Sequence, residues 1–190
     1  MMRFALPLLF ASLSYAQGWS VAAKVPAFSY YDLSGRTLSS VDSAGERATV
    51  VLFISAKCPI SNAYADRMSG LYREYSAKGV RFLFLNANSN EDAAEVAQHI
   101  KEVSFPFPVY KDLNNRVADA AGAQMTPESF VIDASGVLRY HGAIDDSTNE
   151  ARIKRRGLRD ALDAVLAAKP VATPEIKAFG CTIKRVRKSS

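Results

Sequence analysis

The sequence has 190 residues, the size of one compact domain at roughly 100–200 residues. Its 48% hydrophobic and 23% charged residues are typical of a globular chain and exclude collagen-like, disordered and multi-span membrane proteins. The formal net charge of +5 is carried partly by the last few residues, so we expect no nucleic-acid partner. Two cysteines are too few for a disulfide scaffold but are sufficient for redox chemistry.

Residues 1–16 have the pattern of a secretory signal peptide. A charged start is followed by the apolar run 4–13 and by a small-residue exit ending at Ala16. The run is too short to cross a bilayer, which needs about 20 residues. We therefore predict cleavage after Ala16 and a mature chain without stable membrane insertion; an uncleaved anchor is the alternative. We expect a periplasmic or secreted protein, in a compartment that permits disulfides.

The rest of the chain alternates between strand and helix patterns. The apolar, β-branched run 49–54 predicts a strand buried on both faces. From Ile60, apolar residues recur every three or four positions as far as Gly79, which predicts a helix. In chain order we expect a hairpin over 28–41, strands over 49–54, 80–85, 107–110, 129–132 and 137–140, and helices over 60–79, 91–103, 114–121 and 150–168, with Gly157 weakening the first half of the last one.

This order predicts one α/β domain over 17–168, with a central mixed sheet flanked by helices and an N-terminal β-hairpin extension. Residues 169–190 are expected to form an extended tail that carries Cys181. We interpret the basic end of the tail as a solvated terminus, with binding to an anionic membrane or partner as the alternative.

Cys58 stands between the first buried strand and the helix that follows it. We expect its sulfur at the N-terminus of that helix, where free N–H groups and the dipole stabilise an anion and lower the thiol pKa from about 8.5. Pro59 suits the first helical position, and Ser61 offers a hydroxyl or amide to the thiolate. Lys57 adds a positive charge. The alternative is an inert, buried cysteine.

Two segments carry specific motifs, FISAKCPISN at 53–62 and MTPESFVID at 125–133. On these motifs the chain resembles the thioredoxin-like redoxins of the alkyl hydroperoxide reductase/thiol-specific antioxidant group, over roughly residues 25–168. The resemblance implies a thioredoxin-like fold in which the bond between Thr126 and Pro127 is cis and abuts the active-site cysteine.

The same resemblance implies roles for individual residues. Cys58 would be the catalytic cysteine. Pro59, Thr126 and Pro127 would shape the substrate groove, with the backbone of Thr126 pairing with an incoming peptide or thiol substrate.

The departures from this family leave two substrates open. Ser61 stands where thioredoxins have their second cysteine, which excludes a local dithiol. Peroxiredoxins carry Pro-x-x-x-Thr/Ser-x-x-Cys; here Ser55 matches the hydroxyl position, whereas Val51 replaces the proline. Arg139 is our candidate for the arginine that polarises a peroxide. Peroxide reduction and exchange with a protein disulfide are both compatible with this pattern.

A sulfenic acid or mixed disulfide at Cys58 needs a second thiol, and Cys181 is the only other cysteine in the chain. The segment GCTIK at 180–184 also resembles the Gly-Cys-x-Ile-Lys ending of some exported redoxins. We interpret Cys181 as a resolving thiol that acts within one chain or across a homodimer. A static disulfide and an unpaired tail cysteine are the alternatives.

Other polar residues point to no further chemistry. His99 and His141 lack the spacing of metal ligands, so we predict no metal site. Asp145 and Asp146 precede the last helix, a position more typical of capping and solvation than of an acid pair at the site. Neither a phosphate loop nor a dinucleotide motif is present, and we expect no cofactor.

We therefore predict an exported thiol oxidoreductase that acts on a peroxide or a protein disulfide. Cys58 is the expected nucleophile, assisted by Ser55 and Ser61, and Cys181 resolves the product. The sequence does not identify the thiol that donates electrons. A non-catalytic binding module of the cell envelope, with a structural disulfide between Cys58 and Cys181, is the alternative function.

Overall fold

The computed structural model describes residues 18–41 and 45–187. The predicted signal peptide over 1–16 lies outside the described residues. Within the described part of the chain, no helix is long and apolar enough to cross a bilayer.

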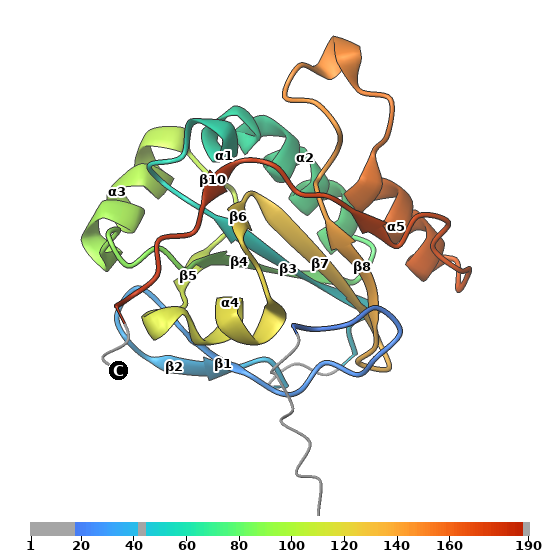
Figure 1. The fold of residues 1–190 in the computed structure, drawn as a ribbon, viewed down its shortest axis with the longest axis horizontal. Coiled ribbons are helices and arrows are strands. Elements are labelled where there is room, and N and C mark those ends of the chain that lie inside the picture. The colour runs from blue at the N-terminus through green and yellow to red at the C-terminus, as the bar shows by residue number, and fades with distance from the viewer. Residues whose placement is uncertain (1–17, 42–44, 188–190) are drawn as a thin grey trace, which may run out of the picture.

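The centre of the molecule is a mixed sheet of eight strands in the order β2-β1-β5-β4-β3-β7-β8-β9 (Figure 1). Strand β3 pairs in parallel with β4 and antiparallel with β7, so it is enclosed on both edges. Within residues 18–41 and 45–187 the strands are β1 (Ser29–Tyr31), β2 (Thr37–Ser39), β3 (Ala48–Ile54), β4 (Val80–Asn86), β5 (Val109–Lys111), β6 (Met125–Thr126), β7 (Glu128–Asp133), β8 (Leu138–Gly142), β9 (Glu175–Ile176) and β10 (Cys181–Thr182). Strands β6 and β10 form a separate two-stranded pair.

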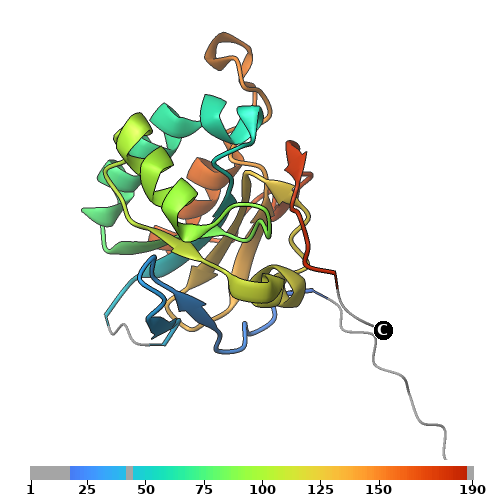
Figure 2. The ribbon, with the colours of Figure 1, turned by 90° about the vertical axis from the view of Figure 1, so that its left-hand side faces the viewer.

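Helices cover both faces of the sheet, as the sequence predicts. They are α1 (Pro59–Ala63), α2 (Ala65–Ser76), α3 (Ala93–Val103), α4 (Arg116–Ala121) and α5 (Gly157–Leu166). Because side chains alternate along a strand, Val50 and Leu52 of β3 pack into the cluster that contains α2, α3 and α5, whereas Val51 and Phe53 pack into the cluster that contains α4. Figure 2 shows these two layers on opposite sides of the sheet.

The expected strands and both hairpins are confirmed with shifts of a few residues at their ends. The hairpin of β1 and β2 turns at Gly35, where φ is +88°. The antiparallel pair of β7 and β8 is the hairpin predicted around 129–140.

The single helix predicted over 60–79 is wrong at Tyr64, where the chain divides it into α1 and α2. Tyr64 has φ −94° and ψ 1°, outside the helical region. Its buried hydroxyl donates to Asp145 at 2.6 Å, and the guanidinium of Arg67 donates to the same carboxylate at 2.6 Å. The break therefore coincides with a buried tertiary contact that the helical period does not reveal.

The last helix is shorter than predicted and begins at Gly157. Residues Glu150–Arg152 form only a short 3-10 helix, and Asp146 accepts from the amide of Lys154 at 2.9 Å instead of capping α5. A Cβ at Gly157 would collide with the hydroxyl of Tyr140. Glycine therefore allows the close approach of α5 to β8, where the sequence predicted a weakened helix.

The tail predicted over 169–190 is extended as far as it is described, but it is not free of the sheet. Strand β9 adds to β8 in parallel, and β10 then pairs with β6. The red ribbon of Figure 1 follows this path from α5 across to α1.

Candidate active site

Cys58 lies at the junction between β3 and α1, as predicted, and caps the helix. The Ser61 amide donates to its sulfur at 3.3 Å, and Pro59 occupies the first helical position. The Cys58 thiol donates to the carbonyl oxygen of Thr126 at 3.2 Å. Only 2% of Cys58 is exposed, so the sulfur is enclosed by these neighbours.

The segment that faces Cys58 is the Thr126-Pro127 dipeptide. Its peptide bond is cis, as the family resemblance implied. Thr126 ends strand β6 and is buried. Strand β7 starts directly after Pro127, so the dipeptide lies at the N-terminal end of an interior strand of the sheet.

Cys181 lies beside this dipeptide, in strand β10. The antiparallel register pairs Cys181 with Thr126 and Thr182 with Met125. The hydroxyl of Thr126 also donates to the carbonyl of Cys181 at 3.4 Å. Neither cysteine is in a disulfide, and the two thiols are near enough to shift each other's pKa.

The two thiols have opposed pKa shifts. Burial acts to raise the pKa of Cys58. Hydrogen bonds from the Cys181 thiol, the Ser61 amide and the Thr126 side chain together outweigh burial and lower that pKa. The hydrogen bond with Cys58, reinforced by burial, raises the pKa of Cys181. Cys58 therefore ionises first while Cys181 keeps its proton and acts as a donor.

Several residues of the GCTIK segment at 180–184 have specific contacts where β10 pairs with β6. Gly180 has φ +152°, and a Cβ there would collide with the carbonyl oxygen of Thr126. Ile183 is 3% exposed and packs into the core on the α4 side of the sheet. The amide of Ile183 donates to the carbonyl of Gln124 at 2.9 Å. The segment thus combines a close backbone approach at Gly180, a thiol at Cys181 and an apolar anchor at Ile183.

The hydroxyls of Ser55 and Ser61 support the loop before Cys58 and do not contact its sulfur directly. Ser61 contacts the sulfur only through its amide, and its hydroxyl accepts from the Ser55 amide at 3.2 Å. The hydroxyl of Ser55 donates to Glu91 at 2.5 Å. The expected assistance from these two side chains is therefore indirect.

Lys57 and Pro59 are exposed at the rim of the site. The ammonium of Lys57 pairs with Glu95 at 2.7 Å and donates to the carbonyl of Asn90 at 2.7 Å, so its hydrogen bonds point away from Cys58. The structure therefore brings together Cys58, Thr126 and Cys181, with Pro59 at the edge of this group.

Arg139 is not at this site, which corrects its assignment as a peroxide-polarising group. Its guanidinium pairs with Asp133 at 2.5 Å, at the turn of the β7–β8 hairpin. Thr126 and Pro127 precede the opposite end of β7. Arg139 is thus separated from Cys58 by the length of that strand.

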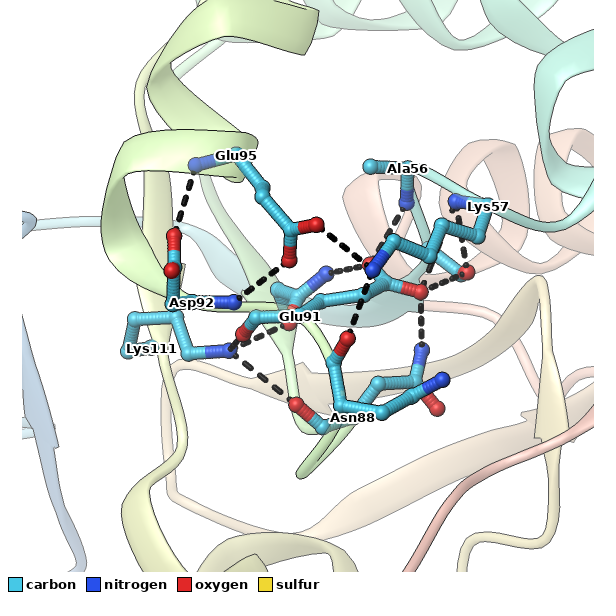
Figure 3. A network of polar contacts seen from close by, with 10 residues as sticks. Ala56, Lys57, Asn88, Glu91, Asp92, Glu95 and Lys111 are labelled. Carbon is cyan, nitrogen blue, oxygen red and sulfur yellow. Dashed lines mark hydrogen bonds and ion pairs between the residues drawn. The ribbon is translucent and has the colours of Figure 1, made fainter.

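Sequence reasoning missed a buried carboxylate behind the Cys58 loop. Glu91 is 3% exposed and accepts from the Ser55 hydroxyl and from the Ala56 amide at 2.8 Å (Figure 3). We expected it in the first turn of α3, but Asp92 caps that helix and Glu91 precedes it. The sequence held a signal for this network. Two asparagines, Asn86 and Asn88, stand where the buried strand β4 ends, shortly before Glu91.

A second missed carboxylate, Glu128, lies behind the Thr126-Pro127 dipeptide. It accepts from the amides of Gln124 and Met125, each at 2.7 Å, and contacts His141 at 2.6 Å. Burial acts to raise the pKa of Glu128, but the contacts with His141 and the two amides lower it overall. This carboxylate braces the strand on which Cys181 docks.

A model of the AhpC/TSA family matches residues 21–141, a range that includes Cys58 and the cis dipeptide. The chain belongs to the AhpC/TSA family. Relatives of this AhpC/TSA protein include a Bacillus cereus protein named thiol-disulfide oxidoreductase ResA, which is 28% identical over 116 residues. That match covers 61% of this chain and 65% of the relative, slightly less than two thirds of its length.

Solved structures share the fold of this AhpC/TSA protein. A hypothetical protein from Sinorhizobium meliloti has a TM-score of 0.80 and 28% identity, covering 90% of this chain and 98% of that one. A thiol:disulfide interchange protein of the thioredoxin family from Chlorobium tepidum has a TM-score of 0.60 and 22% identity, covering 77% and 98%. The predicted thioredoxin-like α/β fold and the family resemblance are therefore confirmed.

Proposed function

We propose that this protein is an exported thiol-disulfide oxidoreductase in which Cys58 is the nucleophile and Cys181 the resolving thiol. One observation carries the proposal: the tail docks Cys181 against Cys58 on the strand that ends at the cis dipeptide. The lowered pKa of Cys58 supports its role, because the thiolate is the attacking form of a cysteine. Export rests on the signal-peptide pattern of residues 1–16.

The reaction consumes one substrate disulfide and produces two substrate thiols. The Cys58 thiolate attacks one sulfur of the disulfide, forms a mixed disulfide with it and releases the other sulfur as a thiolate. Cys181 then loses its proton and attacks the Cys58 sulfur, which releases the second substrate thiolate. Cys58 and Cys181 are left oxidised as a disulfide, and a dithiol reductant must return both to thiols.

The substrate class follows from how the tail is bound. Strand β10 contacts β6 through backbone pairing, and Cys58 is 2% exposed beneath it. A protein disulfide presented on an extended segment can use the same pairing once the tail shifts aside. We therefore assign protein disulfides as substrates, in accordance with the name of the Bacillus cereus relative, thiol-disulfide oxidoreductase ResA.

The reduction step is expected to begin at Cys181. Cys181 is partly exposed, whereas Cys58 is buried, so an incoming thiolate reaches the Cys181 sulfur first. The departing Cys58 thiolate is stabilised by the Ser61 amide at the start of α1, and a better stabilised thiolate leaves faster. The reductant would thus form its mixed disulfide with Cys181 and release the Cys58 thiolate.

Peroxide reduction is less well supported by this geometry. The hydrogen-bond partners of Cys58 are the Ser61 amide, Thr126 and Cys181, and Arg139 pairs elsewhere with Asp133. The docked tail also covers the sulfur that a peroxide would have to reach. A binding module with a permanent disulfide is the other reading to be tested.

Mass spectrometry after timed oxidation tests this function. Reduced wild type, Cys58→Ser and Cys181→Ser are exposed in parallel to oxidised glutathione and to a stoichiometric dose of hydrogen peroxide, with free thiols blocked at intervals. We expect glutathione to produce the Cys58–Cys181 disulfide in wild type and to accumulate as a mixed disulfide at Cys58 in Cys181→Ser.

Four other results would contradict the proposal of exchange within one chain. Oxidation by peroxide that is much faster than by glutathione would indicate a peroxidase. Thiols that stay free under both oxidants would show that Cys58 and Cys181 do not form a redox pair. A disulfide that no dithiol reduces would indicate the binding module. A disulfide that joins differently labelled chains after mixing would show that Cys181 resolves across a dimer.

A further inference from the structure

The loop that connects β4 to α3 contacts both halves of the active site. Its Glu91 holds the segment before Cys58, and its Asn88 and Ser89 hold the tail after Cys181. Figure 3 shows Asn88 and Glu91 side by side within one network of polar contacts. The two cysteines are 123 positions apart in the chain, yet this one short loop adjoins the segments that carry them.

The Glu91 carboxylate accepts hydrogen bonds from two backbone amides and one hydroxyl of the loop that precedes Cys58. One carboxylate oxygen accepts from the Ser55 hydroxyl at 2.5 Å and lies 3.4 Å from the amide of Lys57. The other oxygen accepts from the Ala56 amide at 2.8 Å and from the Asn86 amide group at 2.5 Å. Because a buried carboxylate is costly without donors, these contacts fix the path of the chain into Cys58.

Lys111 supports the same network from beneath. Its buried ammonium donates to the side-chain oxygen of Asn86 at 2.6 Å and to the carbonyl of Glu91 at 2.5 Å. It therefore stabilises the loop backbone and orients Asn86, and its contacts leave both oxygens of the Glu91 carboxylate to their other donors.

Asn88 connects Glu91 to the tail through a single amide group. Its nitrogen donates to Glu91 at 3.1 Å, and its oxygen accepts from the Lys184 amide at 2.7 Å. The carbonyl of Lys184 then accepts from the Ser89 amide at 2.9 Å. Lys184 lies three residues after Cys181, so Asn88 controls where β10 runs beside Cys58.

We infer that Glu91 and Asn88 are positioning residues that keep Cys181 in bonding register with Cys58. This inference rests on the proposed exchange reaction and adds two residues to it. Glu91 orients the nucleophile loop, and Asn88 ties the resolving segment to the same carboxylate. Removing the connection would leave both thiols intact but lower the equilibrium constant for closing their disulfide.

The equilibrium constant of the Cys58–Cys181 disulfide in glutathione redox buffers tests this role. We expect Asn88→Ala to lower that constant about tenfold relative to wild type, equivalent to about 30 mV for a two-electron couple. Asn88→Asp should lower it further, because a second carboxylate would face Glu91 across the same contact. The matched control is Asn90→Ala, at an exposed position on the same loop, which should stay within twofold of wild type.

A polarity swap separates positioning from general destabilisation. The double variant combines Asn88→Asp with Glu91→Gln. The amide nitrogen at position 91 can then donate to the carboxylate at position 88 and to the Ser55 hydroxyl, while the amide oxygen at position 91 still accepts from the Ala56 amide. We expect the double variant to recover a large part of the constant lost in Asn88→Asp. Thermal unfolding of every variant, measured alongside, reports on stability separately.

The outcomes distinguish this inference from the proposed function. Absence of a Cys58–Cys181 disulfide in wild type would overturn both. A wild-type disulfide with an Asn88→Ala constant equal to that of Asn90→Ala would overturn the positioning role alone. So would a double variant no better than Asn88→Asp, since the loss would then not arise from the contact between the two side chains.

Discussion

Cys181 pairs in antiparallel register with Thr126, whose carbonyl oxygen accepts a hydrogen bond from the Cys58 thiol at 3.2 Å. The backbone that the family resemblance assigns to an incoming peptide is therefore occupied by the chain's own tail. One strand pairing both presents the Cys181 thiol and covers Cys58. Undocking of the tail is thus expected to accompany substrate binding. Several variants can separate the presentation of the Cys181 thiol from the covering of Cys58.

The Cys181 thiol should lower the pKa of Cys58 measurably. Cys181→Ala removes a hydrogen bond that favours the Cys58 thiolate, so the pKa of Cys58 should rise. Thiolate absorbance in the ultraviolet, followed against pH, reports this midpoint. In Cys58→Ala, the midpoint of Cys181 should fall toward about 8.5, the ordinary value, because the bond that raises it is gone. An unchanged midpoint in both variants would show that the two thiols do not interact.

Gly180→Ala should undock the tail without altering the rest of the fold. The added methyl group would collide with the carbonyl oxygen of Thr126, so β10 would have to leave β6. We expect closure of the Cys58–Cys181 disulfide to slow at least tenfold in stopped-flow oxidation. Gly136→Ala is the matched control: Gly136 also has a positive φ, +80°, but open space around it. Equal slowing in both variants would mean that strain at a positive φ causes the effect and that the collision with Thr126 does not.

Ile183 should act as the apolar anchor of the tail. It is 3% exposed, and truncation of a buried isoleucine to alanine commonly costs about 2–4 kcal/mol. We expect Ile183→Ala to lower the free energy of unfolding by that order and to make the 169–180 segment sensitive to limited proteolysis. Thr182→Ala, at an exposed position in the same strand, should change neither measurement. A protease-resistant tail in Ile183→Ala would indicate that the backbone contacts alone hold it.

The placement of Cys58 could be predicted from local pattern because a buried strand, a proline and a helical period follow one another directly. The contact with Cys181 could not, since the spacing of the two cysteines permits a static disulfide or a free tail equally well. Three residues together determine the path of the tail: Gly180, Ile183 and Asn88. Their partners are distant in the sequence, and only the folded chain brings them together.

The errors in helix prediction have the same origin. Tyr64 and Gly157 were assessed by helical period and propensity, but each meets a tertiary contact that prevails over local preference. Glu91 is predicted in the first turn of the helix over 91–103, whereas its carboxylate is the centre of a buried network that precedes this helix. Polar residues directly after a buried strand are the signal that would have corrected this assignment.

Glu128 should make part of the acid stability of the protein depend on its ionisation. The contacts with His141 and the two backbone amides lower its pKa in the folded state despite burial. A depressed carboxyl pKa contributes stability above the unfolded value, about 4.5, and that contribution is lost as pH falls through the folded value. Glu128→Gln should therefore be less stable at neutral pH, by about 1–3 kcal/mol, and lose less stability below pH 4.5 than wild type.

The same variant should also slow disulfide closure, because Glu128 accepts from the amides of Gln124 and Met125 in the segment on which β10 docks. Asp133→Asn is the control: the pKa of Asp133 is lowered too, but it lies at the far end of β7 and pairs with Arg139. Chemical unfolding at several pH values and stopped-flow oxidation should show an altered acid profile in both variants and slower closure only in Glu128→Gln. Equal closure rates would mean that Glu128 stabilises the fold without positioning Cys181.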